Sequence, residues 1–363
     1  MKKITKIALT GGPCAGKTTC LCQVRDWLIS HSDAAIFVVP EAATLVFNGT
    51  GRSDNRAIVE HVGHKRQLAI MKTQLSLEDI FADASETETI IICDRGALDI
   101  KAYCTNDEWS AFLHDLNLTE SRLIERYDGV IHMVTAAIGA VEHYRLEGQR
   151  VESAESAACQ DEDIRNAYLG HGHQRIVDNS TDFDSKIKRV IAEVARLIGI
   201  PEPLEIERKF KVRSTNGVLF GRKSSIRQTY LRSSNGIEER VRSRDYGDGI
   251  CYTHTTKQRL RSGVREERER PINGQEYLKL LERRDMALRT IEKVRSCFIW
   301  GDKVYEHDRY TGNLDGLEIV EVEVSNLDDE IEFPGWITDV VEVTDDPRYS
   351  NSSLACHGIP SND

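Results

Sequence analysis

The alternation of apolar and polar positions changes near residue 200 of this 363-residue chain. Before that point, short apolar runs that read as buried strands alternate with longer segments of helical periodicity. These apolar runs cover residues 4–10, 35–39, 89–93, 129–134 and 174–179. After that point, strand-like runs carry Arg, Lys or Glu at alternate positions, so that charge falls on one face of each strand. The pattern predicts a parallel α/β domain with flanking helices, followed by an antiparallel β domain.

A short connector separates the two patterns. A predicted closing helix over residues 183–198 ends at Gly199, and Pro201 and Pro203 follow. Glycine ends helices readily, and two closely spaced prolines make a short, stiff linker. We therefore expect a first domain over residues 1–200, a second domain over residues 203–345 and a C-terminal tail over residues 346–363.

Composition limits the classes of protein that the chain can represent. Its 40% hydrophobic and 29% charged residues are typical of a globular protein, and no apolar run is long enough to span a membrane. The first residues lead into a strand, without the apolar core of a signal peptide. Nine scattered cysteines favour reduced thiols over disulfides or a zinc site, and a net charge of −11 argues against an extended nucleic-acid-binding surface. We therefore expect a cytoplasmic protein.

A glycine-rich motif follows the first apolar run. Residues 11–18 fit the pattern G-x-x-x-x-G-K-[ST], between a predicted strand and a predicted helix. In such a loop the backbone N–H groups cradle phosphate oxygens, while Lys17 would reach the β- and γ-phosphates and the Thr18 hydroxyl would bind Mg²⁺. The predicted nucleotide-binding residues are Gly11, Gly12, Pro13, Cys14, Ala15, Gly16, Lys17, Thr18 and Thr19.

Further candidates follow the later strands of this half, at the sheet edge where open α/β folds bind their ligands. Glu41 is interpreted either as a base or substrate contact, or as part of a helix N-terminus. Asp94 follows the apolar run 89–93, in the position of a carboxylate that holds the Mg²⁺ shell. Arg145 and Arg150 are either lid residues that neutralise phosphate charge or ordinary surface arginines.

The first half resembles the NadR-like P-loop family, which includes bacterial nicotinamide riboside kinases and a eukaryotic GTP-binding branch. The resemblance rests on Gly11 to Thr18, Glu41-Ala42-Ala43, Gln67, Gln74 with Glu78, Asp94-Arg95-Gly96, Arg145-Leu146-Glu147, Asp161 and Val177-Asp178-Asn179. It implies that ATP or GTP binds together with magnesium, and it leaves the phosphate acceptor open.

The first strand of the second half suggests a different kind of site. Read as a strand, this segment places Glu205, Glu207 and Lys209 on one face. Such a face is either a solvated sheet edge or a site for a divalent cation and a phosphate, because hard cations take oxygen ligands and an amine neutralises phosphate. The choice between them depends on whether later strands repeat the pattern.

Later strands do repeat the pattern, and they sort the charges by sign. The basic pairs are Arg240 with Arg242 and Lys293 with Arg295, and the acidic pairs are Glu267 with Glu269 and Glu321 with Glu323. An exposed sheet would mix its charges freely. A tunnel for polyphosphate would instead have a cationic wall and an anionic patch for a metal. The sorted charges therefore favour the tunnel.

The second half resembles the CYTH family of triphosphate tunnel metalloenzymes, over about residues 203–343. The resemblance rests on Glu205, Glu207, Lys209, Arg240, Arg242, Lys257, Arg265, Glu267, Glu269, Lys293, Arg295, Asp308, Glu321 and Glu323. It implies an eight-stranded antiparallel barrel that binds Mg²⁺ or Mn²⁺ and a triphosphate. The implied metal ligands are Glu205, Glu207, Glu267, Glu269, Asp308, Glu321 and Glu323. The implied catalytic cations are Lys209, Arg240, Arg242, Lys257, Lys293 and Arg295.

Two functions fit both halves. In the first, a kinase-like domain binds a magnesium–nucleotide complex, and the tunnel hydrolyses tripolyphosphate or a nucleoside or organic triphosphate. In the second, the P-loop domain switches with its nucleotide, and the tunnel binds an anionic ligand without turnover. The resemblance to a eukaryotic translocation-defect branch associated with GTP and phosphatidic acid suggests a phospholipid head group as that ligand. The carboxylates favour hydrolysis, because a head-group pocket needs the cations but not four metal-binding glutamates.

Overall fold

A computed structural model shows the fold of the chain. It describes residues 3–49, 56–144, 153–200, 207–214, 221–232, 237–261, 264–324 and 328–360, with the side chains of residues 48–49, 56–64 and 258–268 outside the description. The chain divides into two compact units, the first comprising residues 1–119 and 123–205 and the second residues 120–122 and 206–363. Within the described ranges, no helix is both long and apolar enough to cross a membrane.

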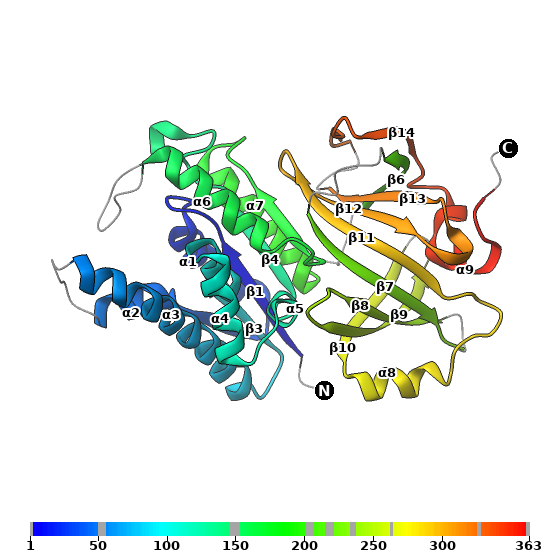
Figure 1. Cartoon of the computed structure of the whole chain (residues 1–363), viewed down its shortest axis with the longest axis horizontal. Helices are drawn as coiled ribbons and strands as arrows, with labels where there is room; N and C mark the ends of the chain where they lie inside the picture. Colours follow the sequence, from blue (N-terminus) through cyan, green and yellow to red (C-terminus); the bar gives the residue numbers. More distant parts are fainter. Residues whose placement is uncertain are drawn as a thin grey trace. The chain divides into compact units, whose positions relative to one another are not determined.

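The first unit is built on a parallel five-stranded sheet in the order β2-β3-β1-β4-β5 (Figure 1). Its strands are β1 (Ile4–Thr10), β2 (Ala35–Val39), β3 (Thr89–Asp94), β4 (Gly129–Met133) and β5 (Gln174–Val177). The three central strands are buried almost throughout, as parallel strands are when helices cover both faces. The predicted α/β fold is therefore confirmed.

Helices cover both faces of this sheet. They are α1 (Lys17–His31), α2 (Ala42–Gly49), α3 (Arg56–Ala84), α4 (Asn106–Leu116), α5 (Glu120–Ile124), α6 (Ala154–Ala167) and α7 (Phe183–Ile198), with the 3₁₀ helices η1 (Ala97–Tyr103) and η2 (Val141–His143). A hydrophobic core lies on each face of this sheet, and alternate residues of β1 point into the two cores. Ile7 and Leu9 pack with α1 and α7, whereas Ala8 packs with α3 and α4.

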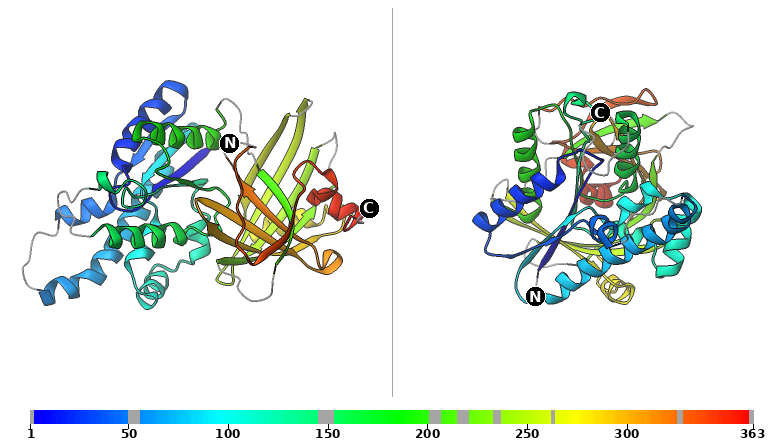
Figure 2. Two further views of the ribbon diagram at one scale, coloured as in Figure 1. Left: turned by 90° about the horizontal axis from the view of Figure 1, so that it is seen from above. Right: turned by 90° about the vertical axis from the view of Figure 1, so that its left-hand side faces the viewer.

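The second unit is built on an antiparallel sheet in the order β10-β9-β8-β7-β11-β12-β13-β6-β14. Its strands are β6 (Glu207–Ser214), β7 (Arg222–Tyr230), β8 (Ile237–Asp245), β9 (Ile250–Arg261), β10 (Val264–Ile272), β11 (Ile291–Trp300), β12 (Lys303–Tyr310), β13 (Glu318–Glu323) and β14 (Ile337–Glu342). The antiparallel fold is confirmed, and the described residues form a sheet of nine strands, where eight were expected. In the described part of the chain, the two end strands β10 and β14 do not pair. The sheet curves strongly, as Figure 2 shows.

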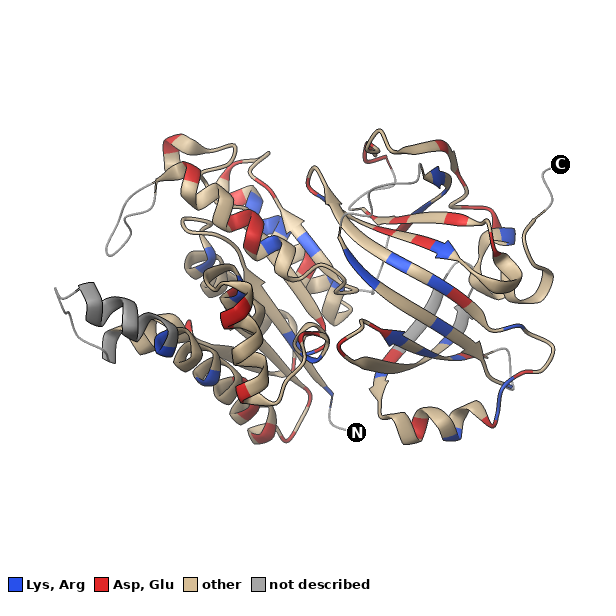
Figure 3. Cartoon of the chain, viewed as in Figure 1, with Lys and Arg blue, Asp and Glu red and all other residues tan. Residues whose placement is uncertain are grey.

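One face of this curved sheet collects the charged residues, because the strand register brings them into line. Arg295 of β11 lies opposite Asp308 of β12. Glu306, two residues earlier on β12 and so on the same face, lies opposite Glu321 of β13, and Glu321 lies opposite Lys209 of β6. Figure 3 shows these bands of basic and acidic residues crossing the strands.

The opposite face of the sheet is apolar. Phe210 of β6 and Val320 and Val322 of β13 form a buried core there with Phe298 of β11. The segment before β14 covers this core through partly buried side chains that include Trp336. The two faces therefore match the alternation of charged and apolar positions that the sequence shows.

The segment after residue 345, which was expected to be a tail, contains regular structure. It holds η4 (Pro347–Tyr349) and α9 (Asn351–His357). Leu354 of α9 is buried in a core shared with Tyr310 and Ile319 of the sheet. This unit also contains α8 (Gly274–Leu281) and η3 (Gly312–Leu314).

Candidate functional site

The phosphate loop lies between β1 and α1 and depends on glycine. Gly11 has a φ of +142°, and a Cβ atom added there would lie 2.1 Å from the carbonyl oxygen of Met133. Gly16 has a φ of +84°, in the left-handed region that glycine adopts without steric cost. Thr18 and Thr19 are exposed in the first turn of α1. The backbone path of residues 11–16 therefore requires the glycines of the motif.

Lys17 folds back over this loop. Its Nζ donates hydrogen bonds to the carbonyl oxygens of Gly11 at 2.7 Å and Gly12 at 2.8 Å. Burial lowers the pKa of Lys17 to about 7; the charge of Arg95 acts in the same direction, and nearby carboxylates, Asp94 first among them, oppose it. An anion bound in the loop would stabilise the charged form of the lysine, which suits a phosphate site.

Arg95 connects the loop to the acidic residues beside it. Its Nε donates to Glu41 Oε1 at 2.6 Å, and its Nη1 donates to Asp99 Oδ2 at 3.1 Å and to the carbonyl oxygen of Gly11 at 3.3 Å. Arg95 has a φ of +77°, a costly conformation for a residue with a side chain. Neither Arg95 nor Asp99 is among the site residues predicted from the sequence. The backbone strain and the ion pairs that identify them depend on the tertiary structure.

The two predicted carboxylates of this unit differ in their surroundings. Both oxygens of Glu41 are engaged, since Thr44 donates to Oε2 at 2.6 Å while Arg95 holds Oε1. Burial raises the pKa of Glu41, but Arg95 and Thr44 outweigh it and lower the pKa overall. Burial raises the pKa of Asp94, against the opposing charge of Lys17. Glu41 is thus held as a carboxylate, whereas Asp94 lacks such compensation and suits a magnesium ion.

Asp161 ties the phosphate loop to the end of β4. Its Oδ1 accepts hydrogen bonds from the backbone N–H of Gly12 at 2.8 Å and of Thr135 at 2.9 Å, and its Oδ2 lies 3.0 Å from Nε2 of His132. Asp161 and His132 are both fully buried. Arg145 and Arg150, the predicted lid residues, lie outside the described residues, so their proposed role stays a prediction.

The charged face of the second unit has Arg295 near its centre. Its guanidinium donates to both oxygens of Asp308, at 2.7 and 2.6 Å, and to Glu321 Oε2 at 2.7 Å; it also contacts Glu306. Lys293 forms an ion pair with Asp308 as well. Asp308 is completely buried between these two cations. Both of its oxygens contact cations, and its predicted role as a metal ligand stays a prediction.

Beside this network lies the acidic end of the face. Lys209 Nζ lies 2.9 Å from Glu321 Oε1, and Glu207 of β6 lies opposite Glu323 of β13. Burial raises the pKa of Glu321, but Lys209 and the other cations outweigh it and hold the pKa well below its usual range. The pKa of Glu207 is raised to about 8, first by its crowded surroundings and then by the charge of Glu321, although the residue itself is exposed at the end of β6. Glu207 is therefore a carboxylate with too little compensating charge.

A divalent cation would relieve that imbalance, so the residues fit the metal that the predicted chemistry requires. Glu207, Glu321 and Glu323 lie on two paired strands. Glu205 lies outside the described residues, and the side chain of Glu267 is not described. Among the side chains that are described, no three acidic, histidine or cysteine residues converge into a ready-made metal centre. A metal bound here would therefore need at least one ligand in addition to the described side chains.

The cationic wall lies on β8. Arg240, Arg242 and Arg244 alternate along it, and Arg242 lies opposite Gln228 of β7 and Thr253 of β9. Nε of Arg242 is buried and makes no hydrogen bond to any described residue. Burial lowers the pKa of Arg242, and the neighbouring arginines add to this effect against Glu269. The guanidinium therefore suits a bound anion.

The remaining predicted residues lie on β9 and β10. Lys257 pairs in register with Glu238 and Glu267. Thr255 Oγ1 donates to Glu269 at 2.7 Å. Its crowded surroundings raise the pKa of Glu269, which is an exposed residue, but Arg242 and this hydrogen bond outweigh that effect and lower the pKa to about 2. Glu269 thus faces the arginines of β8, at the opposite end of the strand order from Glu321.

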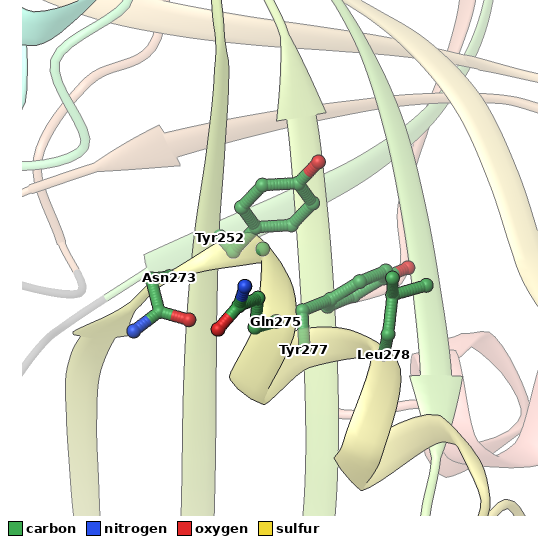
Figure 4. A pocket seen from close by; sticks show the side chains of 6 residues that line it. Tyr252, Asn273, Gln275, Tyr277 and Leu278 are labelled. Carbon is green, nitrogen blue, oxygen red and sulfur yellow. The ribbon is translucent and has the colours of Figure 1, made fainter.

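A shallow cavity of about 480 Å³ lies elsewhere on this unit, beside α8 (Figure 4). Tyr252 and Tyr277 line it with their ring centroids 4.6 Å apart, together with Leu278. Tyr277 belongs to a small core with Val241, on the opposite face of β8 from Arg240 and Arg242. The cavity is therefore separate from the charged face.

Comparisons with known proteins address each half of the chain. A family model described as an AAA domain matches residues 6–186. A solved inorganic triphosphatase is 32% identical, covers 44% of this chain and 97% of its own chain, and has a TM-score of 0.34. A solved protein from Pyrococcus horikoshii is 19% identical, covers 34% of this chain and 81% of its own, and has a TM-score of 0.26.

A curated inorganic triphosphatase of Acetivibrio thermocellus is 31% identical over 151 residues, which cover 41% of this chain and 92% of that protein. The chain therefore combines an AAA-type P-loop region with a region homologous to an inorganic triphosphatase. Because the match spans nearly the whole of this relative, the chain belongs to the family of that inorganic triphosphatase.

Proposed function

We propose that the second unit is a metal-dependent triphosphatase, which hydrolyses inorganic tripolyphosphate or a nucleoside or organic triphosphate. The observation that carries this proposal is the strand register. It aligns the acidic end around Glu207 and Glu321, the central Arg295 and the arginines around Arg242 on one sheet face. A linear triphosphate is a chain of negative charges. It fits a face that offers cations along its length and carboxylates for a metal at one end.

The acidic end would hold the metal. Glu205, Glu207, Glu321 and Glu323 are its proposed ligands. Mg²⁺ or Mn²⁺ bound there supplies Lewis-acid polarisation of the terminal phosphoryl group and a bound water of lowered pKa. The lysine and arginine side chains of the charged face would bind the substrate and stabilise its negative charge.

Those cations orient the substrate and stabilise its charge. Arg242 and Lys257 would bind the phosphate oxygens away from the metal end. Arg295 and Lys293 would stabilise charge on the group being transferred, because preorganised donors act strongly where water is excluded. Asp308 would hold both of these cations in place, so that their side chains need not reorient during the reaction.

For the first unit, we propose a kinase-like nucleotide site for ATP or GTP with Mg²⁺. Lys17 and the loop amides would hold the phosphates, with Thr18 and Asp94 as the magnesium residues. Glu41 and Arg95 would contact the phosphate acceptor. This assignment is supported by the geometry of the loop and by the ion pairs that place Arg95 against it.

A phosphate-release panel tests the enzyme proposal. Tripolyphosphate, ATP, GTP and thiamine triphosphate are each incubated with the full chain and with Mg²⁺, Mn²⁺ or EDTA. The proposal predicts metal-dependent release from at least one of them. The absence of release from all four would contradict it and would favour a regulatory protein whose charged face binds an anionic ligand, such as a phospholipid head group, without turnover.

A further inference from the structure

We propose that the exposed ring of Phe183 is the surface on which the nucleobase of the bound nucleotide stacks. The proposal rests on the nucleotide site inferred above for the first unit, and it adds the chemistry that recognises the nucleoside.

The ring of Phe183 lies directly against the phosphate loop. Phe183 is the first residue of α7, and this residue is 43% exposed. A Cβ atom added to Gly16 would lie 2.3 Å from Phe183 Cε2 and 2.6 Å from Cζ. The position next to Lys17 therefore excludes a side chain in part because the aromatic ring occupies that space. An aromatic ring this exposed gains stability when a planar apolar partner covers it.

The loop that presents the ring is fixed on both sides. Asn179 donates from Nδ2 to the carbonyl oxygens of Thr135 at 2.8 Å and Ile138 at 2.6 Å. Lys186 Nζ donates to Asn179 Oδ1 and to the carbonyl oxygen of Val134, each at 2.6 Å. Asp182 caps α7 by accepting from the backbone N–H of Ser185 at 2.9 Å. A ring presented by such a loop loses little conformational entropy when a ligand stacks on it.

The strand order places this ring on one side of the loop and the reactive groups on the other. β1 lies between β3 and β4 in the sheet. Asp94 and Arg95 follow β3, whereas Phe183 follows β5, beyond β4. Lys17, which would reach the β- and γ-phosphates, interacts electrostatically with the β3 side. The terminal phosphate would therefore face β3, and the nucleoside would extend toward Phe183.

The same loop predicts weak discrimination between bases. Asp178 Oδ1 already accepts from Ser180 and from Arg189 Nη1 at 2.6 Å, and both ends of the Asn179 amide are engaged. The Asn179 amide therefore has no spare group with which to read the edge of a base, and Oδ1 of Asp178 is already occupied. Stacking tolerates any base, because every base has a π-face. Stacking on Phe183 alone should therefore let ATP and GTP bind with similar affinities.

Calorimetric titration of the full chain with MgADP, MgGDP and magnesium pyrophosphate tests the proposal. Diphosphate ligands are used because they should bind weakly to the charged face of the second unit. The binding that Lys17→Ala removes is the binding at the phosphate loop. Phe183→Ala should weaken MgADP and MgGDP by about 5- to 100-fold, the range for loss of one base–aromatic stack. It should leave pyrophosphate unchanged. Phe183→Trp should restore both nucleotides, and Ile29→Ala, at an exposed apolar position of α1, serves as the control.

Three results separate the possible failures. Unchanged nucleotide affinity in Phe183→Ala, together with loss in Lys17→Ala, would overturn the stacking proposal and leave the nucleotide site intact. Equal weakening of pyrophosphate and nucleotides in Phe183→Ala would also overturn it, because the ring would then support the loop only. If the unaltered chain bound neither nucleotide, or if Lys17→Ala had no effect, the nucleotide site itself would be refuted. Thermal unfolding of each variant checks that it is folded.

Discussion

Arg295 and Asp308 face each other on β11 and β12, and the guanidinium donates to both carboxylate oxygens, at 2.7 and 2.6 Å. Asp308 also pairs with Lys293, so a single buried carboxylate holds the two cations proposed to stabilise the transition state. Bidentate pairs of this kind fix the direction of a guanidinium as well as its charge. We therefore expect Asp308 to position these two cations.

Asp308→Asn should keep the shape of the side chain but remove its charge. We expect kcat for triphosphate hydrolysis to fall at least tenfold, and the free energy of unfolding to fall by about 3–5 kcal/mol, because two buried cations lose their partner. Asp302→Asn, at an exposed ion pair beside β12, is the control. The metal concentration for half-maximal activity should stay unchanged. A large increase in that concentration would instead identify Asp308 as a metal ligand.

Arg242→Ala should weaken substrate binding. Its buried Nε has no hydrogen-bond partner among the described residues, so a substrate oxygen would supply one. We expect KM for the hydrolysed triphosphate to rise by about 10- to 100-fold, the equivalent of one hydrogen bond to a charged group. Arg227→Ala is the matched control, since Arg227 forms an exposed ion pair with Glu292. Equal effects of both substitutions would show that only the overall charge matters.

Asp161→Ala should damage the nucleotide site and leave triphosphate hydrolysis unchanged. The substitution leaves the buried N–H groups of Gly12 and Thr135 without their acceptor, at a cost of about 1–3 kcal/mol each. Loss of the contact to Gly12 also frees the phosphate loop. We expect weaker MgADP binding by calorimetry and a lower free energy of unfolding. Asp163→Ala, at an exposed site on the same helix, should have neither effect, and unchanged MgADP binding in Asp161→Ala would refute the role of the contact.

Lys186 should make the free energy of unfolding increase as the pH rises above 8. Burial lowers its pKa from 10.5 to about 8. Between these values the unfolded chain binds a proton that the folded chain does not, so this lysine makes stability rise as pH increases from 8 to 10.5. Chemical denaturation of the unaltered chain and of Lys186→Met across this range should show the difference between them growing with pH. Lys188→Met, at an exposed position of α7, should track the unaltered chain. A constant difference for Lys186→Met would contradict the expected shift.

The structural features that depend on local patterns could be predicted from the sequence. A strand, a glycine-rich loop and a helix are neighbours in the chain, so the position of Lys17 could be predicted directly. Charges at alternate positions likewise placed Glu321 and Arg295 on one side of their strands, because side chains of a strand alternate between its faces. The two sheet types were predicted for the same reason.

The remaining features depend on contacts between distant segments. Arg95 shares a motif with Asp94, but its role depends on a positive φ and on Glu41, which is far away in sequence. The charge of Asp308 was visible, whereas its enclosure by two cations was not. The ninth strand, β14, was not among the eight strands expected, and it pairs with β6 from more than a hundred residues earlier in the chain.

The central claim is that triphosphate hydrolysis takes place on the charged face of the second unit. Phosphate release from tripolyphosphate by the full chain tests it most directly, comparing Glu207→Gln with Lys17→Ala and with Glu292→Gln, an exposed control on β11. The account predicts loss of at least about 99% of the rate in Glu207→Gln, because removal of a proposed metal ligand costs several kcal/mol. The other two variants should keep the original rate. Loss of release in Lys17→Ala with full activity in Glu207→Gln would place the chemistry in the phosphate loop and contradict the account.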